Sequence, residues 1–286
     1  MVASGLVVGL ATGGYPPLSR EISQLALVVA MAFSLTEVSF SGLSPRTEAR
    51  GFLLSLGMSY GVLSGLLLVF AVLSPNPAVR DGWVLMAAVP PAVAVIPVTS
   101  YLRGDVRRSL ISLAVLYLLG LVLVPGMTLA FVGRSVPVGQ VFLQTLLLIG
   151  LPILISRPLR RWPRIGDVRP AAVGLSFFVL VLAIAGSTRD TLGSNPDLLV
   201  SLSVASFLRT FGLGLALLAG TRALGLARAD QVTATTFSSF KNLGLTVVLA
   251  FSFFEPEATL PSIVSLVFEV AWLASLPVVM KTRGSG

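Results

Sequence analysis

The chain contains neither cysteine nor histidine, and only 11% of its 286 residues are charged. Without thiol or imidazole groups it can form no disulfide, no thiolate or imidazole metal site and no cysteine or histidine nucleophile. Soluble proteins carry roughly a quarter charged residues, and disordered ones are poor in apolar residues. Here 55% of the residues are hydrophobic and the mean hydropathy is +0.94. The sequence therefore predicts an all-α membrane protein, and we expect no metal and no cofactor.

The apolar residues form windows long enough to cross a bilayer, which takes about 20 residues. Five windows are free of charge, and four others carry one charged residue each. A weaker, glycine-rich segment at the N-terminus lacks the basic start and the cleavage site of a signal peptide. We predict ten transmembrane helices, at 2–18, 22–41, 51–79, 82–102, 109–133, 135–156, 170–188, 198–221, 231–254 and 258–280.

The positive charges, which give the chain a net charge of +8, indicate its orientation. If the N-terminus is inside, the outer loops hold four basic residues (Arg20, Arg80, Arg134 and Arg189) and the inner ones hold 14 (Arg46, Arg50, Arg103, Arg107, Arg108, Arg157, Arg160, Arg161, Arg164, Arg169, Arg222, Arg228, Lys281 and Arg283). By the positive-inside rule, both termini are expected to be cytoplasmic in a multi-pass cell membrane protein. The arginines then act as topology signals and lipid contacts, and nucleic acid is not an expected partner.

A basic segment, SRPLRRWPRIGDVRP at 156–170, divides the predicted spans. We assign residues 1–155 to a first repeat of five spans plus the start of a sixth at about 135, residues 156–170 to a cytoplasmic linker, and residues 171–286 to the remainder of the second repeat. Because five is odd, the second set of five crosses the membrane in the opposite direction. This arithmetic predicts an inverted repeat, which is the common plan of secondary transporters.

Interrupted helices at the midplane hold the substrate in such repeats. The fourth span contains three prolines, which remove backbone donors, and the ninth has a polar centre with a glycine. We therefore predict a break in both, at Pro90, Pro91 and Pro97 in the fourth span and at Lys241, Asn242 and Gly244, flanked by Ser238 and Ser239, in the ninth.

Three charged residues, Arg209, Lys241 and Glu269, lie midway along predicted spans. A charge at the bilayer centre costs about 3 to more than 10 kcal/mol, so such residues usually face the bundle interior and pair. Their sum of +1 leaves one positive charge for an anionic substrate. The alternative is a permanent ion pair of Glu269 with either cation, which would only fix helix packing.

At these positions the sequence resembles the bile acid:sodium symporter family, in its prokaryotic branch, over nearly its full length. PPAVAVIPVTSYLRGDVRRS aligns with the family's fourth-span motifs, with Pro90 on the family proline and Arg103, Gly104 and Asp105 on the later Arg-Gly-Asn stretch. FSSFKNLGL retains Asn242, Gly244 and Leu245 of the motif Glu-x-x-x-Gln-Asn-x-Gly-Leu, and LPSIVSLVFEVAW resembles the tenth span. The resemblance implies a panel domain (spans 1–2 and 6–7) that rocks against a core domain (spans 3–5 and 8–10), with helices 4 and 9 crossing at the site.

Several of the family's sodium ligands are replaced in this chain. Val95, Ile96, Leu113 and Phe237 offer no side-chain oxygen, Lys241 stands for a glutamine, Ser59 replaces another glutamine, and Ser109 alone is kept. Sodium needs several oxygen ligands, as other hard cations do. We therefore predict degenerate sodium sites, with the Lys241 ammonium in the place and charge of the missing cation.

The predicted function is sodium-independent secondary transport of a small organic anion, with a carboxylate as the simplest candidate. Arg209, Lys241, Asn242 and the half-helix N-termini favour an anion, and Thr99, Ser109 and Ser59 complete the expected polar set. If Lys241 and Glu269 exchange a proton during transport, the coupling ion is a proton, which we favour slightly. If Lys241 stays charged, the protein is a facilitator or exchanger.

Other readings are an auxin-carrier-like or arsenite-carrier-like transporter, a channel, and an intramembrane enzyme. An arsenite carrier would be expected to use a cysteine. A channel usually assembles around a symmetric pore, whereas an inverted repeat places the site inside one chain. An enzyme is disfavoured because no histidine, cysteine, paired aspartates or GxSxG-like serine lies in a span. Beyond the anion, the bilayer and a proton, the sequence specifies no partner or oligomeric state.

Overall fold

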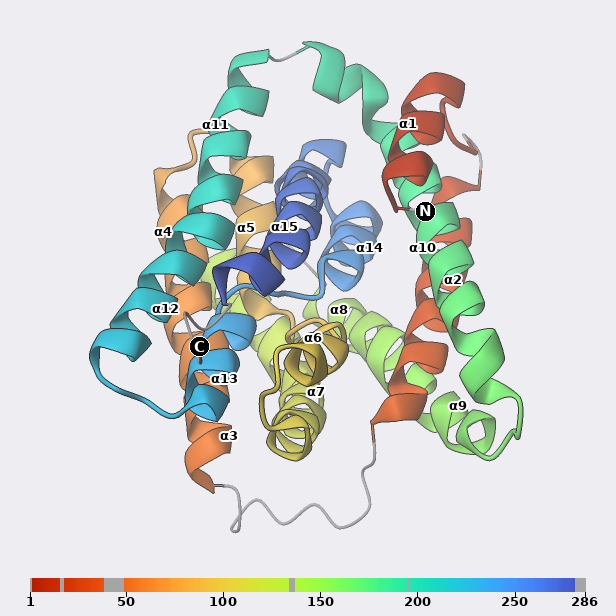
Figure 1. Ribbon diagram of the computed structural model, residues 1–286. Helices are drawn as coiled ribbons and strands as arrows, with labels where there is room; N and C mark the ends of the chain where they lie inside the picture. Colours follow the sequence, from red (N-terminus) through yellow and green to blue (C-terminus); the bar gives the residue numbers. More distant parts are fainter. Residues whose placement is uncertain (1, 16–17, 39–48, 134–136, 195, 281–286) are drawn as a thin grey trace.

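The computed structural model describes residues 2–15, 18–38, 49–133, 137–194 and 196–280, which fold into helices joined by turns (Figure 1). Within these described residues, six helices are long and apolar enough to cross a membrane. The chain is thus an all-α membrane protein. The six are Ala49–Leu73 (α3, Ala49–Leu56; η2, Gly57–Leu63; α4, Ser64–Leu73), Val106–Phe131 (α7), Val138–Arg160 (α8, Val138–Thr145; η3, Leu146–Gly150; α9, Leu151–Arg160), Ile165–Arg189 within α10 (Ile165–Ser194), Pro196–Ala223 (α11, Pro196–Phe207; η4, Leu208–Gly212; α12, Leu213–Ala223) and Pro256–Val279 (η5, Pro256–Thr259; α15, Leu260–Val279).

Two of the predicted spans fold as pairs of short helices. Window 82–102 gives α5 (Pro77–Ala88) and α6 (Val95–Tyr101), and window 231–254 gives α13 (Arg228–Phe237) and α14 (Leu243–Phe253). The first break is 89–94 and contains Pro90 and Pro91, and the second is 238–242. Side chains start the helices that flank them: Asn76 caps α5 and Asn242 caps α14 by accepting from backbone N–H groups that have no helical partner.

Two residues predicted to form the breaks lie outside them. Pro97 is the third residue of α6, where the backbone N–H has no partner within the helix and its loss costs little. Gly244 is the second residue of α14. A Cβ at Gly244 would lie 3.1 Å from Leu27 and 3.3 Å from Leu180, so this glycine permits a close approach between helices instead of a break.

Within the described residues, the first two predicted spans contain helices shorter than the predicted windows. Windows 2–18 and 22–41 give α1 (Val2–Thr12) and α2 (Ser19–Ser34, followed by η1, Leu35–Glu37), which have 11 and 16 residues and are not among the six candidate spans. Gly13 and Gly14, at φ 81° and 71°, follow α1, and such left-handed residues end helices.

The predicted linker 156–170 is mostly helical. α9 continues to Arg160 and α10 begins at Ile165, so only 161–164 lie between them. Arg157 and Arg160 stabilise the last turn of α9 because cations favour the negative end of the helix dipole. Of the residues counted for orientation, Arg46, Arg134, Lys281 and Arg283 lie outside the described residues.

The helices form two groups, which stand side by side in Figure 1. In one, α10 packs along α1 and α2, and α2 packs on α9. Glycines make the α1 contact tight: Cβ atoms at Gly5 and Gly9 would lie 2.7 and 2.6 Å from carbonyl oxygens of α10. In the other group, α5 packs on α4, α7, α14 and α15, while α3 packs on α7 and α13, α12 on α13 and α11 on α15. α14 contacts α2 between the groups.

Candidate functional site

The two helix breaks meet near the middle of the molecule. The backbone N–H of Asn242 donates to the carbonyl oxygen of Pro90 over 2.9 Å, which joins one break directly to the other. The Asn242 side chain accepts from the N–H of Leu245 at 3.0 Å and donates to the Tyr117 hydroxyl at 3.0 Å and to Met31 Sδ at 3.7 Å. Asn242 therefore connects α14 to α7 and to α2 at the point where the breaks meet.

Lys241 is fully buried, and its ammonium is held by oxygens at the end of α5. Nζ donates to Ser64 Oγ at 3.0 Å, to the carbonyl of Ala87 at 3.1 Å and to the carbonyl of Val89 at 2.9 Å. It also lies 4.2 Å from the centre of the Tyr60 ring, a favourable cation–π position. The last carbonyls of a helix lack helical partners and carry partial negative charge. Lys241 thus caps the interrupted helix α5 with a cation.

Glu269, in the middle of α15, forms its ion pair with Arg209 and not with Lys241. Oε1 of Glu269 accepts from Arg209 Nη2 and from the backbone N–H of Lys241, the latter over 3.2 Å. The side chains of Arg209 and Glu269 are 0% and 8% exposed. Arg209 Nε and Nη1 have no hydrogen-bond partner among the described residues. The three central charges are therefore arranged as one ion pair and one separate ammonium.

The residues that surround these charges come from helices with π-helical segments. Tyr60 and Ser59 lie in η2, and Arg209 lies in η4. A π segment adds a residue to the turn and displaces side chains from the regular helical register, and such segments are frequent at functional sites. Tyr60 also donates from its hydroxyl to the carbonyl of Ala88 at 3.2 Å, so η2 covers the end of α5.

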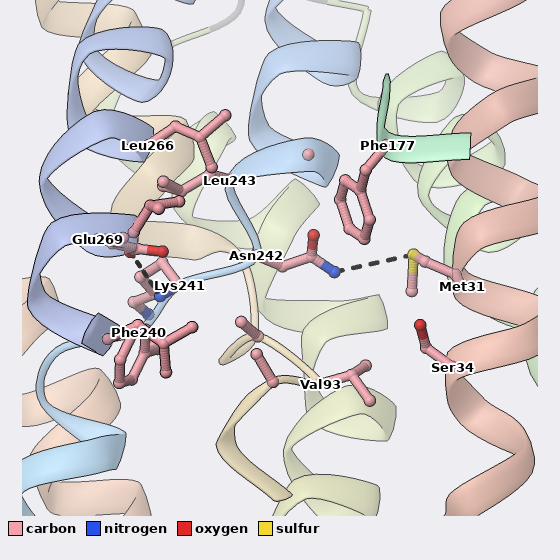
Figure 2. Close-up of a pocket in the computed structure, with 15 residues that line it drawn as sticks. Met31, Ser34, Val93, Phe177, Phe240, Lys241, Asn242, Leu243, Leu266 and Glu269 are labelled. Atoms are coloured by element: carbon pink, nitrogen blue, oxygen red, sulfur yellow. Dashed lines mark hydrogen bonds between the residues drawn. The ribbon is translucent and has the colours of Figure 1, made fainter. Parts of the chain in front are cut away.

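A cavity of about 180 Å³ lies beside the point where the breaks meet. Figure 2 shows Phe177 of α10 and Met31 and Ser34 of α2 on one side of it, and the segment that carries Lys241 and Asn242 on the other. The cavity is thus bounded by both groups of helices. Its lining is mainly apolar, and its polar members are Ser34, Lys241, Asn242 and Glu269.

Lys241 lines this cavity without exposing its ammonium, because the residue is fully buried and Nζ is occupied by the oxygens at the end of α5. Glu269 and Asn242 are each 7% exposed. Arg209 is not among the lining residues, whereas its partner Glu269 is. Of the three central charges, Glu269 is thus the one that lines the cavity and is slightly exposed, whereas both cations are fully buried.

Several predicted site residues lie elsewhere. Ser238 and Ser239 are fully buried and both donate to the carbonyl of Thr235, at 3.2 and 2.7 Å, so they satisfy the end of their own helix α13 and do not line the cavity. Ser59 is buried in η2, and its hydroxyl has no hydrogen-bond partner within the described residues.

The four apolar residues that the family resemblance sets at sodium-ligand positions are packed in hydrophobic cores. Ile96 and Leu113 belong to the core that surrounds α7 and α14, and Val95 and Phe237 to the one that surrounds Trp272. Their side chains are 0% to 5% exposed. Their side chains therefore contribute to the packing of these cores.

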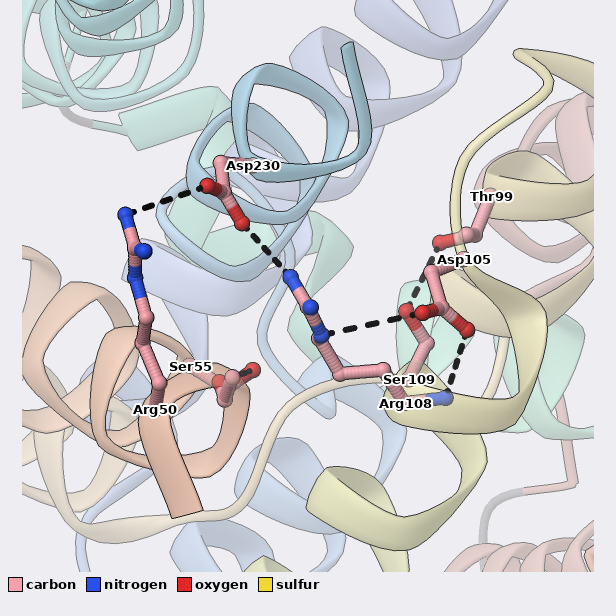
Figure 3. A network of polar contacts seen from close by, with 8 residues as sticks. Arg50, Ser55, Thr99, Asp105, Arg108, Ser109 and Asp230 are labelled. Carbon is pink, nitrogen blue, oxygen red and sulfur yellow. Dashed lines mark hydrogen bonds and ion pairs between the residues drawn. The ribbon is translucent and has the colours of Figure 1, made fainter. Parts of the chain in front are cut away.

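Thr99 and Ser109 bond to each other, with their hydroxyl oxygens 3.3 Å apart, and take no part in the cavity (Figure 3). They lie next to a charged network at the arginine-rich end of the helices. Arg108 reaches Asp230 at 2.5 Å and Asp105 at 3.7 Å, and Arg50 reaches Asp230 at 3.6 Å. This network ties α7, α13 and the start of α3 together. Within the described chain, no cluster of acidic residues is arranged to hold a metal ion.

The main residues that the sequence did not indicate are Ser64, Tyr60 and Tyr117. They lie in apolar windows as ordinary serine and tyrosine residues, and nothing in the pattern distinguishes them. A signal was available instead for the carbonyls of Ala87 and Val89, which accept from Lys241. A lysine buried in a predicted break needs acceptors, and the helix predicted just before the other break was the obvious source of free carbonyls.

A family model described as the SBF-like CPA transporter family (DUF4137) matches residues 44–275, which include both breaks and all three central charges. No curated protein matches the chain.

Proposed function

Because the chain belongs to the SBF-like CPA transporter family, related to bile acid:sodium symporter-like transporters, we propose that it moves a small organic anion by alternating access without sodium. Membership makes the chain a multi-pass membrane transporter. The finer proposal adds that Lys241 takes the place of the coupling cation, as in a prokaryotic bile acid transporter homologue whose sodium sites have degenerated.

The proposed architecture is two inverted repeats of five helices. It is supported by the correspondence between the halves: each contains a long helix with a central π segment (η2 or η4), followed by an interrupted helix (α5 and α6, or α13 and α14) and then by a long helix (α7 or α15). In this proposal α1, α2, α8–α9 and α10 form the panel domain and the remaining helices form the core domain. Arginines gather in the turns and adjoining helix ends at 103–108, 161–164 and 222–228. They support a cytoplasmic location for this arginine-rich end of the helices in the cell membrane.

The observation that carries the proposal is the set of contacts of Lys241. Its ammonium lies 2.9 to 3.1 Å from three oxygens, two of them carbonyls at the interrupted end of α5. Carbonyl and hydroxyl oxygens of this kind are also the ligands that hard cations take. The ammonium supplies the positive charge that the end of α5 requires, so sodium is not needed there.

The size and lining of the cavity point to the kind of substrate. A volume of about 180 Å³ is below the usual 300–1,000 Å³ of ligand pockets, which favours a small molecule. Phe177, Met31, Val93 and Leu266 offer it an apolar surface. The central charges sum to +1, and Leu243 and Gly244, the first two residues of α14, line the cavity at the positive end of that helix. These features favour an anion with a short hydrocarbon body.

Proton coupling is the first candidate for the driving force, and a sodium-independent facilitator or exchanger is the second. The proposal of a Lys241–Glu269 side-chain pair as the proton carrier needs revision, because Glu269 pairs with Arg209 and contacts Lys241 only through the backbone. The ammonium of Lys241 and the ion pair are therefore assigned separate roles, with Lys241 as the fixed cation.

The test is uptake of organic anions by proteoliposomes in which sodium and pH are varied independently. We expect uptake that is unchanged when sodium is replaced by choline and that increases with an inward proton gradient. Strict dependence on sodium would contradict the role of Lys241. Uptake that is indifferent to both gradients would support the facilitator. Lys241→Gln tests the fixed cation, and Arg222→Gln, which removes a charge that bonds the carbonyl of Val279 at the arginine-rich end, is the matched control.

A further inference from the structure

The guanidinium of Arg209 is incompletely used in this structure. It is fully buried, yet only Nη2 has a partner, the carboxylate of Glu269, while Nε and Nη1 have none among the described residues. Guanidinium groups bind carboxylates most strongly through two parallel N–H donors. Arg209 therefore retains capacity for an anionic oxygen at a fully buried position.

Glu269 lies between Arg209 and the cavity. It lines the cavity, whereas Arg209 does not. An anion that enters the cavity thus meets the carboxylate first and reaches the guanidinium only if Glu269 moves away. Lys241 offers no competing site, since its ammonium already has its three oxygen acceptors and is 0% exposed.

We infer that Glu269 is an internal competitor for the substrate: the anion displaces its carboxylate from Arg209, and the displaced carboxylate takes up one proton. The inference rests on the proposed anion transport and names the group that couples it to protons. Before the exchange the site holds a guanidinium and a carboxylate; afterwards it holds the guanidinium, the substrate anion and a neutral carboxylic acid. One anion and one proton have entered together, so the net charge of the site is unchanged.

The proton uptake follows from the surroundings of Glu269. Apart from Arg209 and Lys241, the charged side chains described on the elements packed against α15 lie toward the ends of those elements: Arg80 and Asp81 on α5, Asp167, Arg169 and Arg189 on α10, Asp197 on α11 and Glu257 in η5. Once Arg209 binds the substrate, Lys241 is the remaining cation nearby, and its ammonium is engaged with α5. An unpaired carboxylate at this depth is costly, and protonation removes that cost.

The experiment uses an anion that cannot itself carry a proton. Butanesulfonate is added to the purified full-length protein in weakly buffered detergent solution, and binding is measured by calorimetry while a pH-indicator dye counts the protons taken up. Butanesulfonamide, which is neutral, serves as the control ligand. We expect about one proton per bound sulfonate, and by linkage an affinity that falls about tenfold for each unit rise in pH over the range in which free Glu269 is ionised.

Substitutions test the roles of Glu269 and Arg209 separately. Glu269→Gln keeps the acceptor oxygen for Arg209 and the Lys241 N–H, and we expect it to bind butanesulfonate with no proton uptake and no pH dependence. Arg209→Gln should lose binding, and Arg222→Gln should behave like the wild type. The wild-type proton count stands as a test even if a variant fails to elute as a monodisperse species.

Two results would overturn the inference in distinguishable ways. Binding of butanesulfonate by the wild type without proton uptake, or equal uptake by Glu269→Gln, would exclude Glu269 as the competitor and leave the proposed anion transport intact. An absence of binding by wild type and Arg222→Gln alike would reject the anion site itself, and the proposed function with it.

Discussion

The ion pair between Arg209 and Glu269 yields a quantitative prediction about stability. Glu269→Met leaves the guanidinium buried without its partner, whereas Arg209→Met combined with Glu269→Met replaces the whole pair by apolar side chains. Removing one member of a buried pair costs about 3–5 kcal/mol, because an uncompensated charge remains, while replacing both is often neutral or stabilising. With side chains 0% and 8% exposed, this pair belongs to the fully buried class.

The size of the effect follows from the contacts. In the double variant the lost charge pair is replaced by hydrocarbon, but the backbone N–H of Lys241 still loses its acceptor, which costs about 1–3 kcal/mol. We therefore expect Glu269→Met to be the less stable of the two by about 2 kcal/mol. At roughly 2 °C per kcal/mol for a chain of this length, the single variant should lower the unfolding midpoint by about 6–10 °C and the double variant by about half of that or less.

Tryptophan fluorescence during heating at one fixed scan rate measures these midpoints. Trp272 is a suitable reporter because it is fully buried on α15, one turn from Glu269, and packs edge-on against Phe211 at 5.1 Å. Arg80→Met is the matched control: the Arg80 side chain is 43% exposed and its pair with Asp81 should be worth less than about 1 kcal/mol. The reasoning about an uncompensated buried charge is wrong if the double variant is less stable than Glu269→Met. It is also wrong if Glu269→Met and Arg80→Met have the same unfolding midpoint.

Three further predictions concern the point where the breaks meet. Lys241→Met leaves the Val89 carbonyl without its donor and should lower the unfolding midpoint by a few degrees, for a cost of about 1–3 kcal/mol; a midpoint equal to that of the wild type would show that the cation is dispensable for the fold. Asn242→Ala removes the cap of α14 and should cost about 1 kcal/mol, measured in the same melting assay, and a midpoint equal to that of the wild type would show that the cap is dispensable. Gly244→Ala places a methyl group 3.1 Å from Leu27 and should reduce anion uptake by proteoliposomes more than it reduces the melting midpoint; unchanged uptake would mean that α2 yields at this contact.

The sequence predicted the membrane class and the residues at the centre of the site, and physical reasons explain why. Charge inside an apolar window is costly enough that Arg209, Lys241 and Glu269 could be recognised without a structure. Pro90 and Pro91 could likewise be recognised as a break, since proline has no backbone N–H to donate to a helical hydrogen bond. Pro97 did not mark a break, because the effect of a proline depends on where the next helix starts, and Pro97 lies in the first turn of α6.

The pairing of the charges was beyond the sequence. Glu269 had two candidate cations, and the choice of Arg209 depends on the packing of α15 against η4. Ser238 and Ser239 were misread because a hydroxyl beside a helix end serves its own backbone as readily as a ligand. The acceptors of Lys241 lie more than 150 positions away along the chain, and only the fold brings them together.

The covalent attachment of the ammonium at position 241 changes the relation between the transporter and its surroundings. A dissociable ion occupies its site by mass action, so its occupancy follows the concentration outside. A side chain has an effective concentration fixed by its own tether. Under the proposed sodium-independent cycle, the end of α5 is therefore neutralised to the same degree in fresh water and in brine, and the supply of sodium does not enter the energetics of transport.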